Sequence, residues 1–525
     1  MRHPWTPCRA AWPALGLLTL AAVPAWAQQA MQQAQQAQQA QQDTQGGGSA
    51  ANTQPPLELR MSVMQTFTNN VDLSDTDKRA DAITRLSPGL RWVSRAGRVR
   101  GFVDYSLNTL TYLRDNSTDL RNALASNATA ELLERHAYLD AQAVISQQSI
   151  NPLDAQSTDD QVGRRNRTEV RTLNLTPRVQ GRLGDVAQWD ASLGYQTSHS
   201  TSANAPSFSS TTTQARLGNG EALTALRWSL QASHIARSFS SGRSTAQDTV
   251  RGVLDYRINP ELSTGVIAGW ESTDIASSTK QNRTNYGLRL NWVPSERARL
   301  NAEVERRFFG NAHNVSFFYR LPRAVLSYTD VRSLSNGVGQ PSTVTEGTWY
   351  NVLDKSIPSS VTNPAERDAL VRDYLSQYNI TANPEVLQAF LSSGVTVSRQ
   401  QQLSFAWLLQ RDTITFTLQQ SDGRRISTVV AGSDVFSSFS NIQQRGYSLT
   451  LAHRLTALST LSLGLTQRET SGGELETRLR TMTAAWSTQL NTRAKFSLLG
   501  RHSRFTSPSA PYSESALVGT LATTF

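Results

Sequence analysis

Hydrophobic and polar residues alternate with a period of two over most of the chain from Leu57 onward. In the last stretch, Leu517, Leu521 and the terminal Phe525 share one face, and the residues between them form the other. Successive side chains of a β-strand point to opposite sides, so this is the period of a strand. A chain that ends on an aromatic residue within a strand is typical of the closing strand of an outer-membrane barrel. A buried edge strand of a soluble protein is the alternative.

Similar segments of about 10 to 17 residues recur between turn signals, as in an antiparallel meander. The pattern is plainest in three of them: Trp189 to Tyr195, Tyr286 to Trp292, and Ser459 to Leu465. No stretch after Ala27 approaches the roughly 18 apolar residues of a membrane helix. Barrel strands need no such run, because each is apolar on one face only. The pattern therefore predicts an all-β fold, a transmembrane antiparallel β-barrel.

The number of strands follows from the requirement that both ends of the barrel lie in the periplasm, which makes the number even. A single strand over Ala137 to Ser149, between those ending near Leu113 and starting near Thr168, gives an odd total. We therefore predict a further crossing over Leu120 to Ala128, followed by a short helical turn over Ala130 to Arg135. The expected number is then about 22 strands.

Short turns of such barrels face the periplasm and long loops face outward. The short turns predicted here are Arg95 to Gly97, Gly184-Asp185, Asn259 to Glu261, Pro294 to Glu296, Leu321 to Arg323, Gln410 to Asp412, Thr456-Ala457 and Asn491-Thr492. The long segments expected outside include Asn151 to Arg165, Thr201 to Phe208 and Ser333 to Arg399.

Tryptophans support this assignment of sides. Five lie on the apolar face of a strand close to a short turn: Trp92, Trp189, Trp292, Trp407 and Trp486. Tryptophan favours the headgroup level, where its ring is buried and its N–H stays wet, so we expect these five to form one interfacial girdle. Core aromatics of a large soluble β-fold are the alternative, but that alternative does not explain their position beside the turns.

The long segment 333–399 has a different pattern. Asn363-Pro364 and Asn383-Pro384 are helix-start signals, and each precedes apolar residues at helical spacing. We expect a small helical hairpin that caps the outer mouth or folds into it, as wide barrels usually carry a plug. The alternative is an exposed surface loop with no gating role.

The N-terminus carries a targeting signal. Basic residues, an apolar run and Ala25-Trp26-Ala27 predict a signal peptide over residues 1–27. Residues 28–56 repeat Gln-Gln-Ala and then turn Gly- and Pro-rich, which predicts a disordered leader, or in part a short solvated helix. The barrel is expected over 57–525. The single cysteine, Cys8, belongs to the signal peptide, so no disulfide framework or thiolate metal site is expected after it.

Composition offers little sign of catalysis. The six histidines after the signal peptide stand singly, without metal spacing or a nucleophile motif around them: His136, His199, His234, His313, His453 and His502. We expect no catalytic residues, no metal and no cofactor, and hence no enzyme. The net charge of +10 does not indicate nucleic acid, because an exported protein rarely meets any.

Basic residues recur on the face opposite the apolar one. The lumen-facing candidates are Arg178, Arg182, Arg251, Arg257, Arg289, Arg299, Arg307, Lys495 and Arg501. Cations on a water-filled wall lower the energy of anions there. Glutamate and aspartate occur on the same face, so simple pairing across strands is an equal alternative.

Several motifs in the first hundred residues of the barrel resemble one family. They are Thr66 to Leu73, Ile83 to Leu90, Asp104 to Leu107, and Leu139 to Ala141 before Ile145 to Gln148. The chain resembles the outer-membrane β-barrels associated with the PEP-CTERM/exosortase system of Gram-negative bacteria, whose loci often carry exopolysaccharide genes.

The resemblance implies an outer-membrane location and a channel or scaffold for exopolysaccharide export or surface-protein display. A passive porin for small anions is a close alternative, and a non-conducting structural or adhesive surface protein is another. Expected partners are outer-membrane lipid, the barrel-assembly machinery, which reads Phe525, and an anionic polysaccharide or exopolysaccharide-export components. Nucleic acid is not expected.

Overall fold

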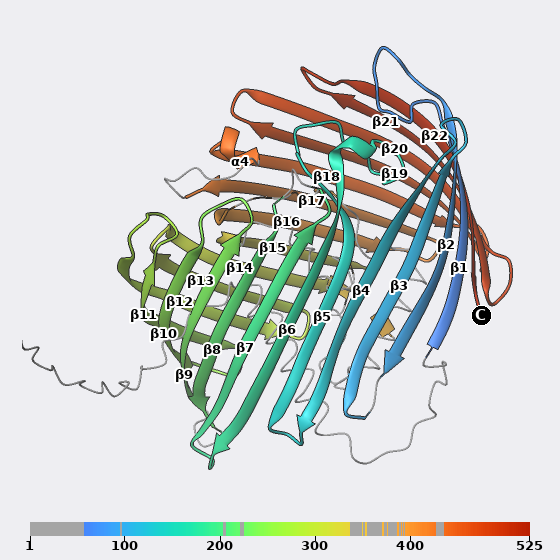
Figure 1. Ribbon diagram of the computed structural model, residues 1–525. Helices are drawn as coiled ribbons and strands as arrows, with labels where there is room; N and C mark the ends of the chain where they lie inside the picture. Colours follow the sequence, from blue (N-terminus) through green and yellow to red (C-terminus); the bar gives the residue numbers. More distant parts are fainter. Residues whose placement is uncertain are drawn as a thin grey trace, which may run out of the picture.

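A computed structural model of the 525-residue chain describes residues 57–94, 97–202, 206–220, 225–335, 394–426 and 435–525, with individual residues between 349 and 392. The described part forms 22 antiparallel strands (Figure 1). They are β1 (Leu57–Thr68), β2 (Asp81–Ser94), β3 (Val99–Tyr112), β4 (Ser117–Leu133), β5 (Ala137–Ser149), β6 (Arg167–Leu183), β7 (Ala187–Ser200), β8 (Phe208–Asn219), β9 (Leu226–Phe239), β10 (Thr245–Arg257), β11 (Leu262–Thr273), β12 (Gln281–Ser295), β13 (Ala298–Arg307), β14 (Gly310–Leu321), β15 (Ala324–Ser335), β16 (Thr396–Leu408), β17 (Asp412–Arg425), β18 (Asn441–Arg454), β19 (Ser459–Gly472), β20 (Leu475–Gln489), β21 (Ala494–Thr506) and β22 (Tyr512–Thr524).

Each strand pairs with the next, and β22 pairs with β1 from Arg60↔Thr524 to Thr68↔Ala516. This last pairing closes the sheet, so no edge strand is left with unpaired backbone groups. The predicted fold class and strand number are confirmed. The 3-10 helix η1 (Arg164–Asn166) and the single helical turn α4 (Val435–Ser438) are short. None of the helices in the described ranges is long and apolar enough to cross a membrane.

The additional crossing predicted over Leu120 to Ala128 is present as β4, but the helical turn predicted after it is wrong. Strand β4 continues to Leu133, and a tight turn with Arg135 at φ 61° leads into β5. The His136 N–H donates to the Leu133 carbonyl oxygen across this turn at 3.0 Å. The chain reverses in three residues, which leaves no room for a helix.

Two prolines lie in the interior of strands, Pro88 in β2 and Pro177 in β6, and a third, Pro294, lies at the end of β12. The ladder to the following strand is interrupted at Pro88 and Pro177, between Leu86 and Gly89 and between Leu175 and Arg178. Proline has no N–H to donate, so one side of each strand loses a rung while the pairing to the preceding strand is kept.

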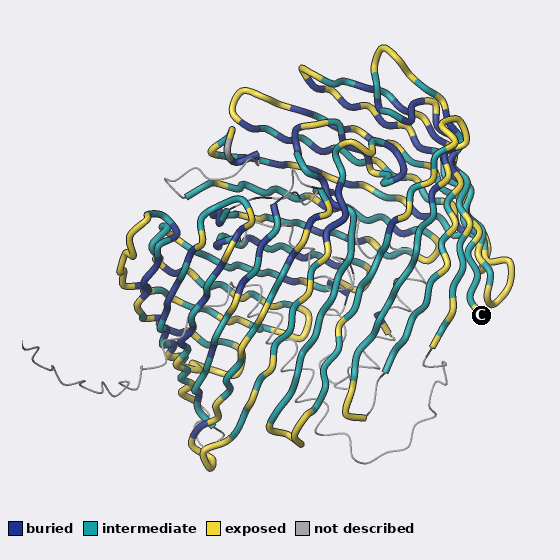
Figure 2. Tube along the Cα trace, viewed as in Figure 1, coloured by how far each residue is buried: buried dark blue, intermediate teal, exposed yellow. Residues whose placement is uncertain are grey.

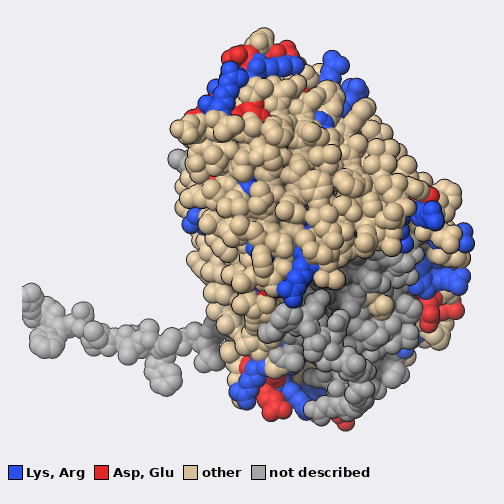
Figure 3. All heavy atoms as spheres, turned by 90° about the vertical axis from the view of Figure 1, so that its right-hand side faces the viewer, with Lys and Arg blue, Asp and Glu red and all other residues tan. Residues whose placement is uncertain are grey.

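The outer face of the wall is apolar. Large hydrophobic side chains that alternate along the strands are exposed there, among them Leu59, Leu193, Leu288, Leu463 and Leu521. Much of the wall in Figure 3 carries no charged side chain, and Lys, Arg, Asp and Glu gather toward its margins. In water such a surface would be unfavourable, whereas a bilayer covers it.

The buried residues concentrate toward the extracellular ends of the strands, where loops pack against lumen-facing side chains (Figure 2). One cluster joins Val71 and Val162 from two loops to lumen-facing residues such as Ile83, Leu110 and Tyr512. Among the described residues, fewer are buried toward the periplasmic ends of the strands.

The predicted signal peptide and leader, and most of the predicted helical hairpin of segment 333–399, lie outside the described residues.

Candidate functional site: the lumen of the barrel

The strand register places the nine basic residues named above on the lumen side. Each alternates with residues of the apolar outer face; Arg251, for example, follows Val250, and Arg289 follows Leu288. Five of the nine form ion pairs: Arg178 with Asp140, Arg251 with Glu303 and Glu305, Arg289 with Asp255 and Glu303, Arg307 with Glu271, and Arg501 with Glu514 and Asp159. Within the described ranges, Arg257, Arg299 and Lys495 form none.

A network of charges covers the lumen wall of β10 to β13. The Arg251 side chain, 5% exposed, lies 3.0 Å from Glu305 and also pairs with Glu303. Arg289 joins Glu303 to Asp255, at 3.2 Å from each. These carboxylates neutralise the two arginines, so this wall favours the pairing interpretation over anion attraction.

Glycines on the same wall make the network possible. Arg251 on β10 must pass over β11 and β12 to reach β13, and its register partner on β11 is Gly269. A Cβ at Gly269 would clash with the Val250 carbonyl oxygen and lie 2.5 Å from Asn285 Oδ1. Gly265 and Gly287 leave similar gaps beside Asp255 and Glu305. The charged groups therefore occupy the space that side chains at these glycine positions would fill.

The loop between β5 and β6 folds back against the lumen wall, although the sequence predicted only that it lies outside. Its Asp159 carboxylate lies 2.7 Å from Arg501 of β21, and its Asp160 carboxylate pairs with Arg85 of β2. Tyr112 donates its hydroxyl hydrogen bond to the Gln161 carbonyl oxygen at 2.8 Å. The loop is therefore tied to strands on both sides of the β1–β22 seam.

The Arg501 guanidinium is central to the contact between the β5–β6 loop and the lumen wall. It binds Glu514 as well as Asp159, and all three side chains are less than a tenth exposed. Burial acts to raise the pKa of Asp159, but Arg501 and the Gln161 N–H outweigh it and hold that pKa below its ordinary value. Asp159 is therefore charged at neutral pH, and the pair with Arg501 is intact.

A cavity of about 870 Å³ lies below this loop in the periplasmic half of the lumen. Strands β1 to β3 and β18 to β22 supply its lining. Met64 and Arg85 form its upper boundary, and both contact the loop, Met64 through Gln161 and Arg85 through Asp160. We call this space the chamber.

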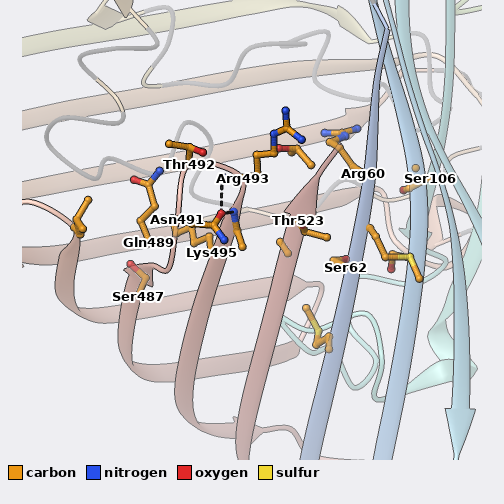
Figure 4. Close-up of a pocket in the computed structure, with 18 of the residues that line it drawn as sticks. Arg60, Ser62, Ser106, Ser487, Gln489, Asn491, Thr492, Arg493, Lys495 and Thr523 are labelled. Carbon is orange, nitrogen blue, oxygen red and sulfur yellow. Dashed lines mark hydrogen bonds between the residues drawn. The ribbon is translucent and has the colours of Figure 1, made fainter.

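The chamber is lined by five basic side chains and a single acidic one. The basic residues are Arg60, Arg85, Arg454, Arg493 and Lys495, and the acidic one is Asp104. Figure 4 shows Arg493 at the periplasmic turn before β21 and Lys495 at the start of β21, with Arg60 on β1 beyond the intervening β22. In the described part of the chain no carboxylate pairs with Arg493 or Lys495, so the chamber carries an excess of positive charge, which stabilises anions.

Part of the opposite wall is covered from within. Described residues of the segment between β15 and β16 pack on lumen-facing residues near the periplasmic turns: Trp349, Val352, Leu353 and Val371 contact a cluster that includes Phe318, Val325 and Ala406. Trp349 is 1% exposed. At least these residues of the long segment enter the bore.

The five tryptophans of the expected girdle lie on the outer face near periplasmic turns. Trp189, Trp292, Trp407 and Trp486 are 36% to 45% exposed, which is the surface that lipid would cover. Trp486 Nε1 donates to Ser459 Oγ at 2.9 Å, so its polar atom has a partner at this level. Phe525 follows β22, and its N–H donates to the Leu59 carbonyl oxygen at 2.9 Å.

No protein-family model and no curated protein matches the chain. Solved structures do. A variant of the ferric enterobactin receptor PfeA from Pseudomonas aeruginosa aligns over 91% of this chain and 81% of that one, with a TM-score of 0.50 and 10% identity. The FrpB iron transporter from Neisseria meningitidis aligns over 90% and 82%, with a TM-score of 0.47 and 9% identity.

The chain is a 22-stranded outer-membrane β-barrel. At 10% identity the likeness to the enterobactin receptor concerns the fold alone, and it confirms the predicted fold class. The apolar outer face of the closed barrel agrees with the predicted outer-membrane location. The barrel resembles siderophore receptors structurally, and no specific family is identified by these comparisons.

Four lumen residues were not predicted from the sequence, namely Arg60, Arg85, Arg454 and Arg493, and neither was Asp159 as the partner of Arg501. Alternation along β1 and β2 could have indicated the first two, because Arg60 follows Leu59 and Arg85 precedes Leu86. No local pattern indicates that Asp159, 342 residues from Arg501, lies beside it.

Proposed function

We propose that this protein is an outer-membrane conduit for anionic solutes, with the chamber as the place where the anion is held. The observation that supports it best is the excess of cations over anions in the chamber lining, set against the neutralised wall of β10 to β13. Arginine and lysine beside a low-dielectric wall attract anions more strongly than in free solution.

An anionic polysaccharide is the cargo that we favour. A chamber lined by serine, threonine, asparagine and glutamine beside its basic residues can donate hydrogen bonds to hydroxyl and carboxylate groups. The sequence resemblance to the exosortase-associated barrels, whose loci often carry exopolysaccharide genes, supports the same class of cargo.

Conductance in planar bilayers tests the proposal. We expect the wild-type protein to conduct with anion over cation selectivity, measured as a reversal potential in a salt gradient. The double variant R493Q/K495Q should lose about half or more of that selectivity at low salt, and high salt should mask the difference through screening. The matched control is R480Q/R504Q, which removes the same charge from the outer face, because Arg480 and Arg504 are register partners on the same face as Met482 and Leu498.

Equal effects of the two double variants would contradict a role for the chamber. The second candidate is a non-conducting structural or adhesive surface protein, and the packing of Trp349 and Val371 against the inner wall favours it. Absence of conductance from the wild type, and from a D159N/D160N variant in which the β5–β6 loop is released, would favour that second candidate over a conduit.

A further inference from the structure

A second group of basic residues lies on the outer face of the barrel, at the extracellular ends of β13 to β17. It consists of Arg306, Arg332, Arg399 and Arg424, which we call the outer arginine cluster. Arg332 and Arg399 are direct register partners on neighbouring strands. Arg424, Arg399 and Arg306 all lie close enough to repel the charge of Arg332. Like charges placed directly opposite each other in a sheet destabilise it unless something neutralises them.

The carboxylates of this region are already engaged. Asp330 accepts both arms of Arg399, at 3.0 and 2.6 Å, and also lies 2.8 Å from His313 Nε2. Asp422 is the register partner of Arg399 and accepts from Gln443 at 3.4 Å. In the part of the chain that the structure describes, Arg306, Arg332 and Arg424 form no ion pair. Asp422 lies close enough to attract Arg332 and Arg399, so the four arginines share two nearby carboxylates, Asp330 and Asp422, and the cluster keeps an excess of positive charge.

Two of the guanidinium groups are held in place by one residue. The side-chain oxygen of Asn311 accepts from Arg306 Nη1 at 3.0 Å, and the main-chain oxygen of Asn311 accepts from Arg332 Nη1. The Arg332 guanidinium also lies over the Phe309 ring, 6.0 Å from its centroid. Holding two like charges side by side costs free energy, and an anion bound by both would offset it.

The height of the cluster indicates which anion. Trp407 marks the periplasmic level of the wall, and its register partners are Ala324 on β15 and Ile414 on β17. Arg332 follows Ala324 by eight residues along β15, and Arg424 follows Ile414 by ten residues along β17. At about 3.3 Å per residue and a tilt of about 40°, these separations correspond to about 20 to 25 Å along the membrane normal. That is about the height of the apolar band of such barrels, so the cluster lies at the outer headgroup level.

Apolar side chains lie farther toward the periplasm on the same face, below a polar row formed by Asp330, Gln401 and Gln420. Leu326, Phe405 and Leu418 belong to the outer faces of β15, β16 and β17 at this lower level. A ligand that contacts both regions carries acyl chains beneath an anionic headgroup. Guanidinium groups match phosphate oxygens in geometry and charge.

We propose that the outer arginine cluster binds the phosphorylated headgroup of a glycolipid of the outer leaflet. The site is separate from the lumen and does not depend on the function proposed for the chamber. Arg306 and Arg332, positioned by Asn311, bind the phosphate, and Arg424 adds a third cation. The acyl chains of the same lipid cover the apolar residues below.

Native mass spectrometry of the purified full-length protein in detergent tests this proposal, with bisphosphorylated lipid A as the probe. The R332Q/R424Q variant should bind the probe about tenfold more weakly than the wild type at low salt. The matched control, R257Q/R299Q, removes the same charge from the lumen side and should bind as the wild type does. Both variants must first show the wild-type shift between boiled and unboiled protein on gels.

Two further arms identify the chemistry. Dephosphorylated lipid A should bind the wild type about as weakly as the intact probe binds R332Q/R424Q; equal binding of the two lipids to the wild type would overturn the proposal. Millimolar inorganic phosphate should compete only partly, because it lacks acyl chains; complete displacement would show a free-phosphate site instead. Equal affinity of R332Q/R424Q and the lumen control for the probe would also overturn the proposal.

If R332Q/R424Q misassembles, N311A replaces it. This substitution removes only the Asn311 side-chain support of Arg306, and it should still weaken binding of the probe.

Discussion

The wall formed by β10 to β13 and the chamber wall formed by β18 to β22 and β1 to β3 both present basic side chains to the lumen, yet they differ in what lies beside each charge. On the first wall Arg251 and Arg289 are enclosed by Glu303, Glu305 and Asp255. In the chamber Arg60 pairs with Asp104 and Arg85 with Asp160, whereas Arg493 and Lys495 form no ion pair with any described residue.

The difference shows that the number of arginines on a lumen face does not by itself indicate an anion site. Where carboxylates and glycine gaps occur in matching register, the arginines form ion pairs within the wall and are neutralised there. Where they do not, the field extends into the space beside the wall. Pairing thus describes the wall of β10 to β13, and anion attraction is the proposal for the chamber.

The largest expected effect on the free energy of unfolding comes from removing a carboxylate from the ion-pair network of β10 to β13. The substitution E305A leaves Arg251, 5% exposed, with one carboxylate fewer and Asn285 without its acceptor at 2.6 Å. We expect a loss of about 3 kcal/mol in the free energy of unfolding, because it breaks a buried ion pair. Urea titration followed by the mobility difference between boiled and unboiled protein measures it. The control is E296Q in the exposed periplasmic turn; equal losses would contradict the comparison.

A smaller effect is expected from filling a glycine gap on the same wall. The substitution G269V places a side chain against the Val250 carbonyl oxygen and Asn285. Overpacking of this kind costs about 2 kcal/mol, and the same urea titration measures it. The control is G519A on the outer face of β22, where no atom lies within 4 Å of the added Cβ. A tolerated G269V would show that Arg251 does not need this gap.

Acid should weaken the tie between the β5–β6 loop and the chamber roof. The pKa of Asp159 is lowered in the folded protein, so its contribution to stability is present above the ordinary value of 3.8 and is lost as pH falls through the lower, folded value. We expect loop cleavage by pepsin to increase below pH 3.8, with a loss of about 1 kcal/mol since Glu514 still pairs with Arg501.

The D159N variant provides the control for that experiment. It lacks the titrating carboxylate, so its cleavage at pH 5 should already resemble that of the wild type in acid. Cleavage of the wild type that does not change between pH 5 and pH 3 would mean that the Asp159 pair does not hold the loop.

The smallest effect on stability is expected in the chamber. The substitutions R493Q and K495Q remove side chains that form no ion pair in the described part of the chain, so each should change the free energy of unfolding by less than about 0.5 kcal/mol. The same urea titration measures it. A loss as large as that of E305A would show that the chamber cations are structural, and the contrast between the two walls would disappear.

The sequence alone was sufficient to predict the barrel, its number of strands and the lumen side of the nine basic candidates. Strand alternation is local: Leu288, Arg289 and Leu290 are assigned to opposite faces by neighbours in the chain. The parity of the strands then follows from the positions of the ends, so that β4 could be predicted although its pattern is weak.

The tertiary structure decided which charges are neutralised. Arg251 meets Glu305 across 54 residues and three strand pairings, and Arg501 meets Asp159 across 342 residues through a loop that turns back into the lumen. Alternation gives the face of a residue but not its height or its neighbours along the wall, because these depend on the register of every intervening strand. The sequence therefore determined which face of the wall the basic side chains occupy, and the closed sheet decided which of them have a carboxylate as an ion-pair partner.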